Sequence, residues 1–143
     1  MESERENYCK CLYYAANALS RNITRLADKA FEPVGMAPSY AFVLITINRK
    51  PGLTAGELAI ILQLQPSTVT RFIETLEKKR FIQRINDGKF VTLFPLRKSM
   101  DMQEQLLHCW QSLYKTYSDL LGREEADKLA ADIYSASALL EKK

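Results

Sequence analysis

The chain has 143 residues, of which 47% are hydrophobic and 26% are charged, with only five glycines and five prolines. This is the composition of an ordinary globular protein, so extensive disorder is excluded, and the longest apolar runs are too short to span a membrane. The three cysteines form an odd set and the first residues are too acidic for a signal peptide. We therefore expect a cytoplasmic protein without a disulfide framework.

Charge is distributed unevenly along the chain, although the net charge is only +3. Residues 48–98 carry ten Lys or Arg and four Asp or Glu, whereas residues 1–47 carry five of each and residues 99–143 carry five and eight. The positive excess therefore lies in the middle, as expected when one segment meets an anion and the flanking segments do something else.

The first part of the sequence predicts two helices. Apolar residues recur at three- and four-residue intervals over residues 5–31, which is typical of one long helix. Residues 32–35 interrupt this pattern with a proline and a glycine. A second helix is then expected from Pro38 to Arg49, where a Pro-Gly pair ends it.

A helix-turn-helix pattern follows. Thr54 and Glu57 have the spacing of a capping box, in which each side chain accepts a hydrogen bond from a free amide at a helix start. A short helix to Leu62 and a tight turn lead to Pro66, which suits the first position of the next helix because its missing amide would be unpaired there. On that helix, the side chains expected to be buried are Val69, Phe72, Ile73 and Leu76.

The hydrophobic period then changes from helical to alternating. Residues 82–85 and 90–94 are rich in β-forming residues, so a β-hairpin with a two-residue turn at Asp87-Gly88 is predicted between them. Residues 97–121 predict a second long helix, and a last helix follows Gly122. The terminal helices are too long to be covered by so small a core, so a second copy of the chain is the simplest partner for their apolar surface.

The predicted fold is mostly α-helical with a small β-hairpin wing. Residues 38–96 are interpreted as a winged helix-turn-helix DNA-binding domain, and residues 1–37 and 97–143 as a helical dimerisation region. In such a module the second helix enters the major groove of duplex DNA, and the hairpin reaches the flanking backbone or the minor groove. The candidate DNA-binding residues are Thr54, Gln65, Pro66, Ser67, Thr68, Thr70, Arg71, Arg84 and Lys89.

The same region resembles the DNA-binding core of MarR-family regulators. The similarity is carried by LTAGELA at residues 53–59 and by PSTVTRFIETLEKKRFIQR at residues 66–84, and the flanking helices match the family's layout. The resemblance implies an obligate homodimer with interlocking terminal helices. It also implies that residues 66–71 face the major groove and that Arg84 lies at the base of the wing.

One departure from the family's pattern concerns the wing. The family usually has an Asp-x-Arg element, whose arginine enters the minor groove, followed by a Leu-Thr-x-x-Gly helix start. This sequence has NDGK at residues 86–89 and LFPL at residues 93–96, so the wing is predicted to be short and to lack the arginine. Lys89 is the nearest substitute. Since lysine is less selective than a planar guanidinium, we expect weaker or differently placed wing contacts.

Two kinds of regulatory site are compatible with the sequence. Cys11, near Tyr13 and Tyr14, resembles the sensing cysteine of the peroxide-responsive OhrR branch, with Cys9 as a competing candidate, although a helical cysteine is also a common small hydrophobe. The resemblance also implies a phenolic or other lipophilic ligand. Residues proposed to line a pocket for such a small aromatic ligand are Tyr13, Tyr14, Tyr40 and Trp110, whose helical spacing is equally that of a packed core.

No motif in the sequence indicates catalysis, a cofactor or a metal site. There is no glycine-rich phosphate loop and no nucleophile elbow, and His108, the only histidine, lacks the spacing of a metal-ligand pair. The leading hypothesis is therefore a homodimeric transcriptional repressor on a palindromic operator in double-stranded DNA, responsive to a phenolic or lipophilic ligand or to an oxidant. The alternative is a winged-helix adaptor that binds another protein and has weakened DNA binding.

Overall fold

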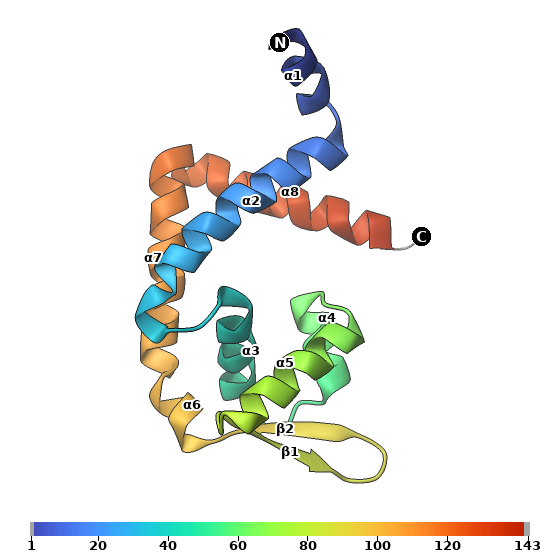
Figure 1. The fold of residues 1–143 in the computed structure, drawn as a ribbon, viewed down its shortest axis with the longest axis vertical. Helices are drawn as coiled ribbons and strands as arrows, with labels where there is room; N and C mark the ends of the chain where they lie inside the picture. The colour runs from blue at the N-terminus through green and yellow to red at the C-terminus, as the bar shows by residue number, and fades with distance from the viewer. Residues whose placement is uncertain (1, 142–143) are drawn as a thin grey trace. The chain divides into compact units, whose positions relative to one another are not determined.

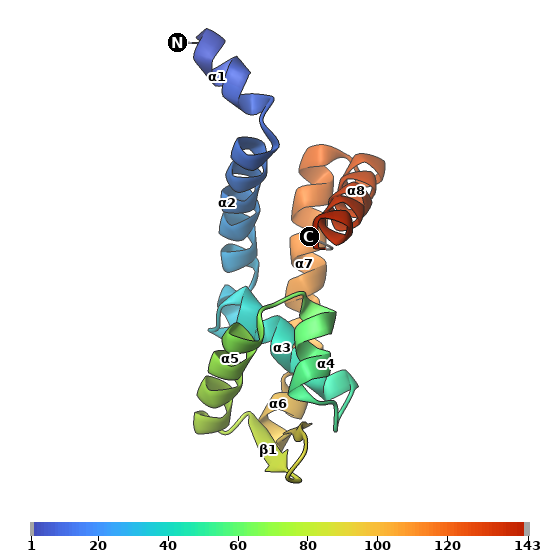
Figure 2. The same cartoon turned by 90° about the vertical axis from the view of Figure 1, so that its right-hand side faces the viewer.

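A computed structural model describes residues 2–141 of the chain, which divides into two compact units (Figures 1 and 2). The first unit comprises Met1–Ala30 and Gln111–Lys143, and the second comprises Phe31–Trp110. Helices dominate both units, and the described residues contain one sheet, a two-stranded antiparallel hairpin in the second unit. The predicted fold class, mostly α-helical with a hairpin wing, is confirmed.

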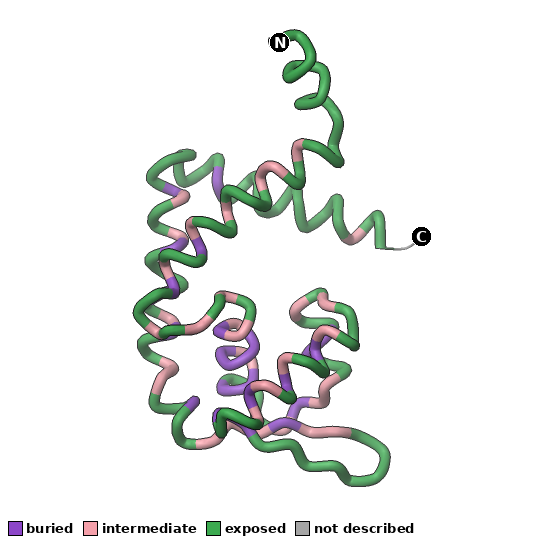
Figure 3. Tube along the Cα trace, in the orientation of Figure 1, coloured by how far each residue is buried: buried purple, intermediate pink, exposed green. Residues whose placement is uncertain are grey.

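The second unit is built around one buried helix, α3 (Pro38–Arg49), which is apolar on nearly every face (Figure 3). A helix of this kind needs apolar neighbours on all sides, because it has no polar face to turn toward water. The elements that pack against α3 are α4 (Ala55–Leu62), α5 (Pro66–Lys78), β2 (Val91–Pro95) and α6 (Arg97–Asp101). Together with α3 and with Ile82 at the start of the hairpin, they supply a core that includes Leu44, Leu58, Ile73 and Leu93.

Helices α4 and α5 form the predicted helix-turn-helix. The Glu57 amide donates to Thr54 Oγ1 at 3.0 Å and the Thr54 amide donates to Glu57 Oε1 at 2.8 Å, so the capping box is complete. Gln63, at φ 54°, is in the left-handed region and ends α4. Pro66 occupies the first turn of α5, as expected from its missing amide.

Three of the four side chains predicted to be buried on α5 are buried, namely Val69, Ile73 and Leu76. Phe72 is half-buried and packs against Tyr40, with 4.7 Å between the ring centroids. The apolar stripe of α5 therefore faces α3, which leaves the opposite face of α5 open to solvent.

The end of α5 contains an arginine in an unusual backbone conformation. Arg80 has φ 65°, and the amides of Arg80 and Phe81 donate to the carbonyls of Glu77 and Leu76, each at 3.0 Å. This is the Schellman arrangement, in which the left-handed position is most often glycine because a Cβ is disfavoured there. Arg80 therefore carries a conformational cost that its side chain, which is exposed, does not offset by packing.

The hairpin consists of β1 (Ile82–Asn86) and β2, with Ile82 opposite Pro95 and Asn86 opposite Val91. Residues 52–54 extend it as a short third edge, because Gly52 donates to the Leu93 carbonyl at 2.7 Å and the Leu93 amide donates to the Leu53 carbonyl at 2.9 Å. The connection before α4 is thereby tied to the wing, which stiffens the base of the hairpin.

The hairpin turn lies one residue later than predicted. The Asp87 amide donates to the Phe90 carbonyl at 3.2 Å, so Gly88 and Lys89 are the central residues of the turn. The shift has a local cause: the Asp87 carboxylate accepts the amides of Lys89 and Phe90, at 3.1 and 2.8 Å, which a central turn position would not allow. Gly88 has φ 90°, a conformation that glycine adopts without strain.

The first unit corrects one helix prediction. Residues 5–31 do not form one helix, because α1 (Glu2–Cys9) ends in a tight turn and α2 (Leu12–Ala30) begins after it. The amides of Lys10 and Cys11 bond to carbonyls three residues earlier, at 3.3 and 2.9 Å. No proline or glycine marks this break, so the sequence pattern gave no sign of it.

The predicted helix 97–121 is also divided. It consists of α6 and α7 (Gln103–Leu121), separated at Met102, and α7 contributes residues to both units. Gly122, at φ 90°, separates α7 from α8 (Arg123–Glu141), as predicted. Among residues 2–141, no helix is both long and apolar enough to cross a membrane.

Candidate nucleic-acid interface

The first turns of α5 present polar groups to solvent. Gln65, Pro66, Ser67, Thr70 and Arg71 are exposed and Thr68 is half-buried. The side chain of Gln65 does not cap the helix, which leaves the Ser67 amide available to a ligand, whereas Pro66 has no amide hydrogen and the Thr68 amide donates to the Gln65 carbonyl at 3.0 Å. Free amides and the helix dipole together attract an anion such as a phosphate.

Within this segment the side chains differ in what they can still offer. The Thr70 hydroxyl donates to the Pro66 carbonyl at 3.0 Å, so in this rotamer it offers a partner only its acceptor lone pairs. Arg71 forms no ion pair within the described chain, and its guanidinium carbon lies 6.0 Å from the centroid of the Phe72 ring. Arg71 is therefore a free, exposed cation on the outer face of α5.

Thr54 has a different role from the other candidates. Its hydroxyl oxygen accepts the Glu57 amide. Its own amide donates to the Glu57 carboxylate, and this bond, followed by one from the Thr54 side chain, holds the pKa of the Glu57 carboxyl below its ordinary value. The side chain of Thr54 is thus engaged in capping α4. Its place in the structure is that of a helix cap, and its oxygen is already an acceptor.

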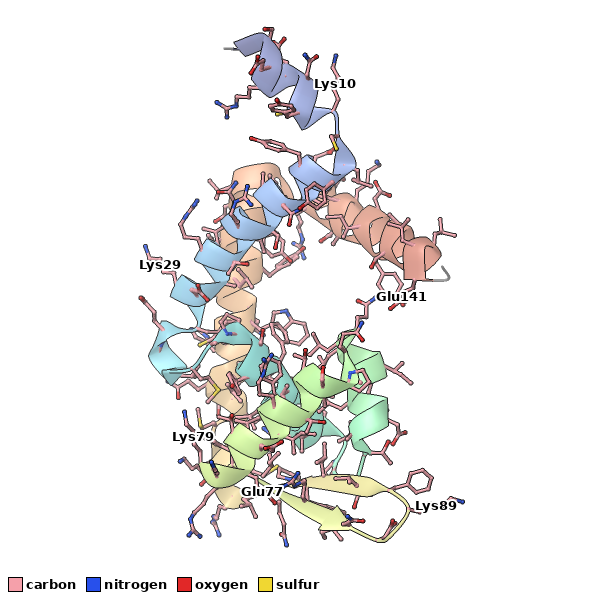
Figure 4. All side chains as sticks on the ribbon, turned by 45° about the vertical axis from the view of Figure 1, so that its right-hand side comes forward. Lys10, Lys29, Glu77, Lys79, Lys89 and Glu141 are labelled. Carbon is pink, nitrogen blue, oxygen red and sulfur yellow. The ribbon has the colours of Figure 1, made fainter. Side chains whose placement is uncertain are left out.

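Arg84 is paired with an acid that sequence reasoning did not single out. Its Nη2 and Nε lie 2.8 and 3.0 Å from Glu77 Oε1, and its amide donates to Glu77 Oε2 at 3.3 Å. The pair joins the last turn of α5 to the base of the wing, and Figure 4 shows Glu77 at this junction. Arg84 is thereby held beside a carboxylate that competes with a phosphate for its guanidinium, which weakens it as a free phosphate ligand.

Lys89 lies at the far end of the hairpin (Figure 4). It is exposed and forms no ion pair among residues 2–141. The carboxylate of the neighbouring Asp87 is turned toward the backbone, where the amides of Phe90 and Lys89 hold its pKa below the ordinary value. The turn therefore presents a free ammonium group, although it also contains an acid.

The candidates for a regulatory site fall into the two units separately. Cys11, Tyr13 and Tyr14 belong to the first unit, where all three are exposed and Cys9 and Cys11 flank the break between α1 and α2. Tyr40 and Trp110 belong to the second unit. The structure therefore does not gather these residues within either unit.

Trp110 lies in an aromatic cluster of the second unit. Its ring meets Phe42 edge-on, with 5.2 Å between centroids, and Phe42 in turn packs against Phe31 at 5.7 Å. The guanidinium carbon of Arg49 lies 5.6 Å from the Trp110 centroid. An aromatic surface beside a cation can hold an aromatic anion, and 38% of Trp110 is exposed to receive one.

Neither the third cysteine nor the acidic residues form a reactive or metal-binding site within residues 2–141. Cys109 is buried, which raises the pKa of its thiol, and within residues 2–141 no three His, Cys, Asp or Glu side chains are grouped as metal ligands. Sequence reasoning also missed a buried cluster: Asn48 Nδ2 donates to Gln103 Oε1 at 2.7 Å and to the Ser99 carbonyl at 3.0 Å. These partners are about fifty residues apart in the chain, so no local pattern could have revealed them.

Residues 38–89 match the family model described as MarR family. The HTH-type transcriptional regulator BilQ of Clostridioides difficile is 22% identical over 127 residues, which are 89% of this chain and 84% of that protein. Residues 38–89, which match the family model, contain the helix-turn-helix, the outer face of α5 and most of the hairpin turn.

Two solved structures illustrate the likeness of fold. A mutant MarR from E. coli complexed with operator DNA has a TM-score of 0.78 and 20% identity, and the likeness covers 91% of this chain and 96% of that one. The transcriptional repressor CouR bound to p-coumaroyl-CoA has a TM-score of 0.80 and 18% identity, with 91% and 94% covered. At these identities the likeness concerns the fold, a winged helix with helical extensions.

Proposed function

We propose that this chain, a MarR-type transcriptional regulator whose residues 38–89 match the MarR family model, represses transcription by binding a palindromic DNA operator as a homodimer. In this proposal α5 enters the major groove, with its first turn against base edges and phosphates, and the wing contacts the flanking DNA. The solved complex of a mutant MarR with operator DNA supports this mode of binding in a protein of the same fold.

The observation that carries the proposal is the outer face of α5. Residues 65–73 contain no acid, Val69 and Ile73 are buried, and Ser67 and Arg71 are exposed. Hydroxyl and guanidinium groups at a free helix N-terminus are suited both to phosphates and to base edges. The nearest acid along the helix, Glu74, is exposed one turn after Arg71 and forms no ion pair with it, so the guanidinium stays available to a ligand.

The homodimer is proposed from the apolar surface of the first unit. A single chain leaves large side chains exposed there, on α2, α7 and α8. They are Leu12, Leu120, Leu121, Ile133, Leu139 and Leu140. A second copy of the chain would cover them, and a twofold dimer reads an operator whose half-sites are related by the same symmetry.

The signal is proposed to be a lipophilic aromatic anion or an oxidant. The Arg49–Trp110 cluster supports the first, since CouR, a repressor of the same fold, is solved with p-coumaroyl-CoA. The exposed thiols of Cys9 and Cys11 support the second. Either signal would act by changing the separation of the two recognition helices, because a dimer that no longer matches the groove spacing loses half of its contacts.

The test is selection of bound sequences from a random duplex pool, followed by salt titration of the selected duplex with wild type and Arg71→Ala. We expect the wild type to bind an imperfect palindrome and Arg71→Ala to lose about 1–3 kcal/mol if it reads a base, or one unit of salt slope if it contacts phosphate. Arg21→Ala, an exposed arginine on α2, is the matched control and should bind like wild type.

Failure has a defined meaning in this test. A folded dimer that retains no duplex at low salt would contradict the proposal and favour the protein-binding adaptor. Repetition of the selection with a phenolic acid and with peroxide identifies which signal releases the DNA.

A further inference from the structure

The tip of the wing carries an exposed aromatic side chain. Phe90 is 53% exposed, whereas the other five phenylalanines of the chain are buried or half-buried. Exposure of a large apolar group at the end of a hairpin, away from any core, gives no folding stability. Single exposed apolar residues are common on protein surfaces, so Phe90 gains significance only from the turn that holds it and from the charge beside it.

The tip is held in one conformation by its own hydrogen bonds. Asp87 Oδ1 accepts the amides of Lys89 and Phe90, Asn86 Oδ1 accepts the Gly88 amide at 2.9 Å, and the Asp87 amide donates to the Phe90 carbonyl. An aromatic ring on a rigid turn loses little conformational entropy when it binds. The turn thus presents Phe90 in advance of binding.

The charge beside Phe90 selects an anionic partner. Lys89 Nζ lies 5.9 Å from the centroid of the Phe90 ring, and the carboxylate of Asp87, the acid of the turn, is taken up by backbone amides. A free ammonium group next to an apolar ring matches the minor groove of DNA, where phosphates flank stacked bases. It does not match the apolar surface of a protein partner, which would leave the ammonium group without a counter-charge.

The wing has the reach that this partner requires. Figure 1 shows α5 running alongside the hairpin, with the α5 N-terminus and the hairpin turn toward the same side, and the Glu77–Arg84 pair joins the two elements. Five-residue strands extend about 17 Å. Half a turn of B-form DNA is also about 17 Å, so a wing beside a helix in the major groove meets the adjacent minor groove.

We propose that Phe90 is a minor-groove wedge that inserts at a base step beside the major-groove site of α5, with Lys89 on the flanking phosphate. This inference rests on the proposed function and names a residue that determines which operators are bound. Partial insertion of an apolar side chain costs least at flexible pyrimidine–purine steps, so Phe90 selects for TA or CA steps without hydrogen bonds to their bases.

The experiment compares Phe90→Ala, Lys89→Ala and Ile85→Ala on the selected operator and on copies in which the step under the wing is TA or lies within an A-tract. Ile85 is the matched control, because it is an exposed apolar residue (44%) on strand β1 of the same hairpin. A 2-aminopurine base at the step reports unstacking by its fluorescence.

We expect wild type to prefer the TA operator about tenfold and to raise the 2-aminopurine fluorescence. Phe90→Ala should lose both the preference and the fluorescence rise while its salt slope stays at the wild-type value. Lys89→Ala should lower the salt slope by about one and keep the preference. Ile85→Ala should stay within about twofold of wild type on every duplex.

Two results would overturn the wedge. If wild type binds the operator and Phe90→Ala keeps both the step preference and the fluorescence rise, Phe90 is not a wedge, although the proposed function stands. If Ile85→Ala loses as much as Phe90→Ala, the effect belongs to the hairpin as a whole. Wild type that binds no duplex contradicts the proposed function and the wedge together.

Discussion

The two units of the chain differ in how they treat apolar side chains. The second unit has a core of large, fully buried residues, including Phe31, Leu44, Ile47 and Leu93, each at 0% exposure, although a few of its apolar side chains, such as Ile60, are exposed. The first unit leaves Leu120 and Leu139 exposed by 72% and 69%, and its buried residues are few and mostly small. The difference teaches that the second unit is stabilised by its own core, whereas the first needs a second surface to cover it.

The largest expected effect is on the core of the second unit. Leu44→Ala should reduce the free energy of unfolding by about 3 kcal/mol, because a cavity opens in a fully buried helix. Urea unfolding, followed by circular dichroism, measures the change.

Leu139→Ala is the counterpart in the first unit. It should change the free energy of unfolding of the second unit by less than about 0.5 kcal/mol and should raise the dissociation constant of the dimer in sedimentation. If both variants lower the free energy of unfolding by the same amount, the two units do not differ in how they are stabilised.

A smaller effect of opposite sign is expected at the end of α5. Arg80→Gly should increase the free energy of unfolding by about 1 kcal/mol, since it relieves the left-handed backbone at φ 65°. Lys79→Gly is the control, because Lys79 has φ −83° and loses the same charge without any relief of strain. Thermal unfolding of both variants decides the point, and a gain shared by both would show that charge rather than backbone conformation is responsible.

The smallest effect concerns the cap of α4. Because the pKa of Glu57 is lowered in the folded chain, its contribution to stability is present above the unfolded value near 4.5 and is lost as pH falls through the folded value. Glu57→Gln should therefore flatten the stability profile below pH 4.5, whereas Glu141→Gln on α8 should leave it unchanged. If the stability of the Glu57 variant still falls below pH 4.5 as the stability of wild type does, the cap is not the source of that pH dependence.

Local patterns were sufficient for the elements of the second unit. Thr54, Glu57 and Pro66 act within one turn of their own positions, so the start of each helix of the helix-turn-helix was predictable from neighbours in the sequence. The observed hairpin turn lies one residue after the predicted one, because the choice between two adjacent turns depends on which backbone amides donate to the Asp87 carboxylate.

Other features were not predictable, for identifiable reasons. The break at Lys10 contains no helix-breaking residue, and α1 has no described buried side chain to keep it in line with α2. Glu77 is seven residues from Arg84, on another element, and only folding brings them within 2.8 Å. Phe90 was assigned to a strand by composition, and its exposure became visible only when the turn was placed.

By itself, the sequence determined where the helices of the winged domain begin, which stripe of α5 is apolar, and that positive charge gathers in the middle third, because these properties depend on residue type and near neighbours. The tertiary structure decided which cations stay free. Arg84 is ion-paired with a residue from another element, whereas Arg71 and Lys89 form no ion pair among the described residues. Such pairing depends on distances between elements, which a linear pattern does not contain.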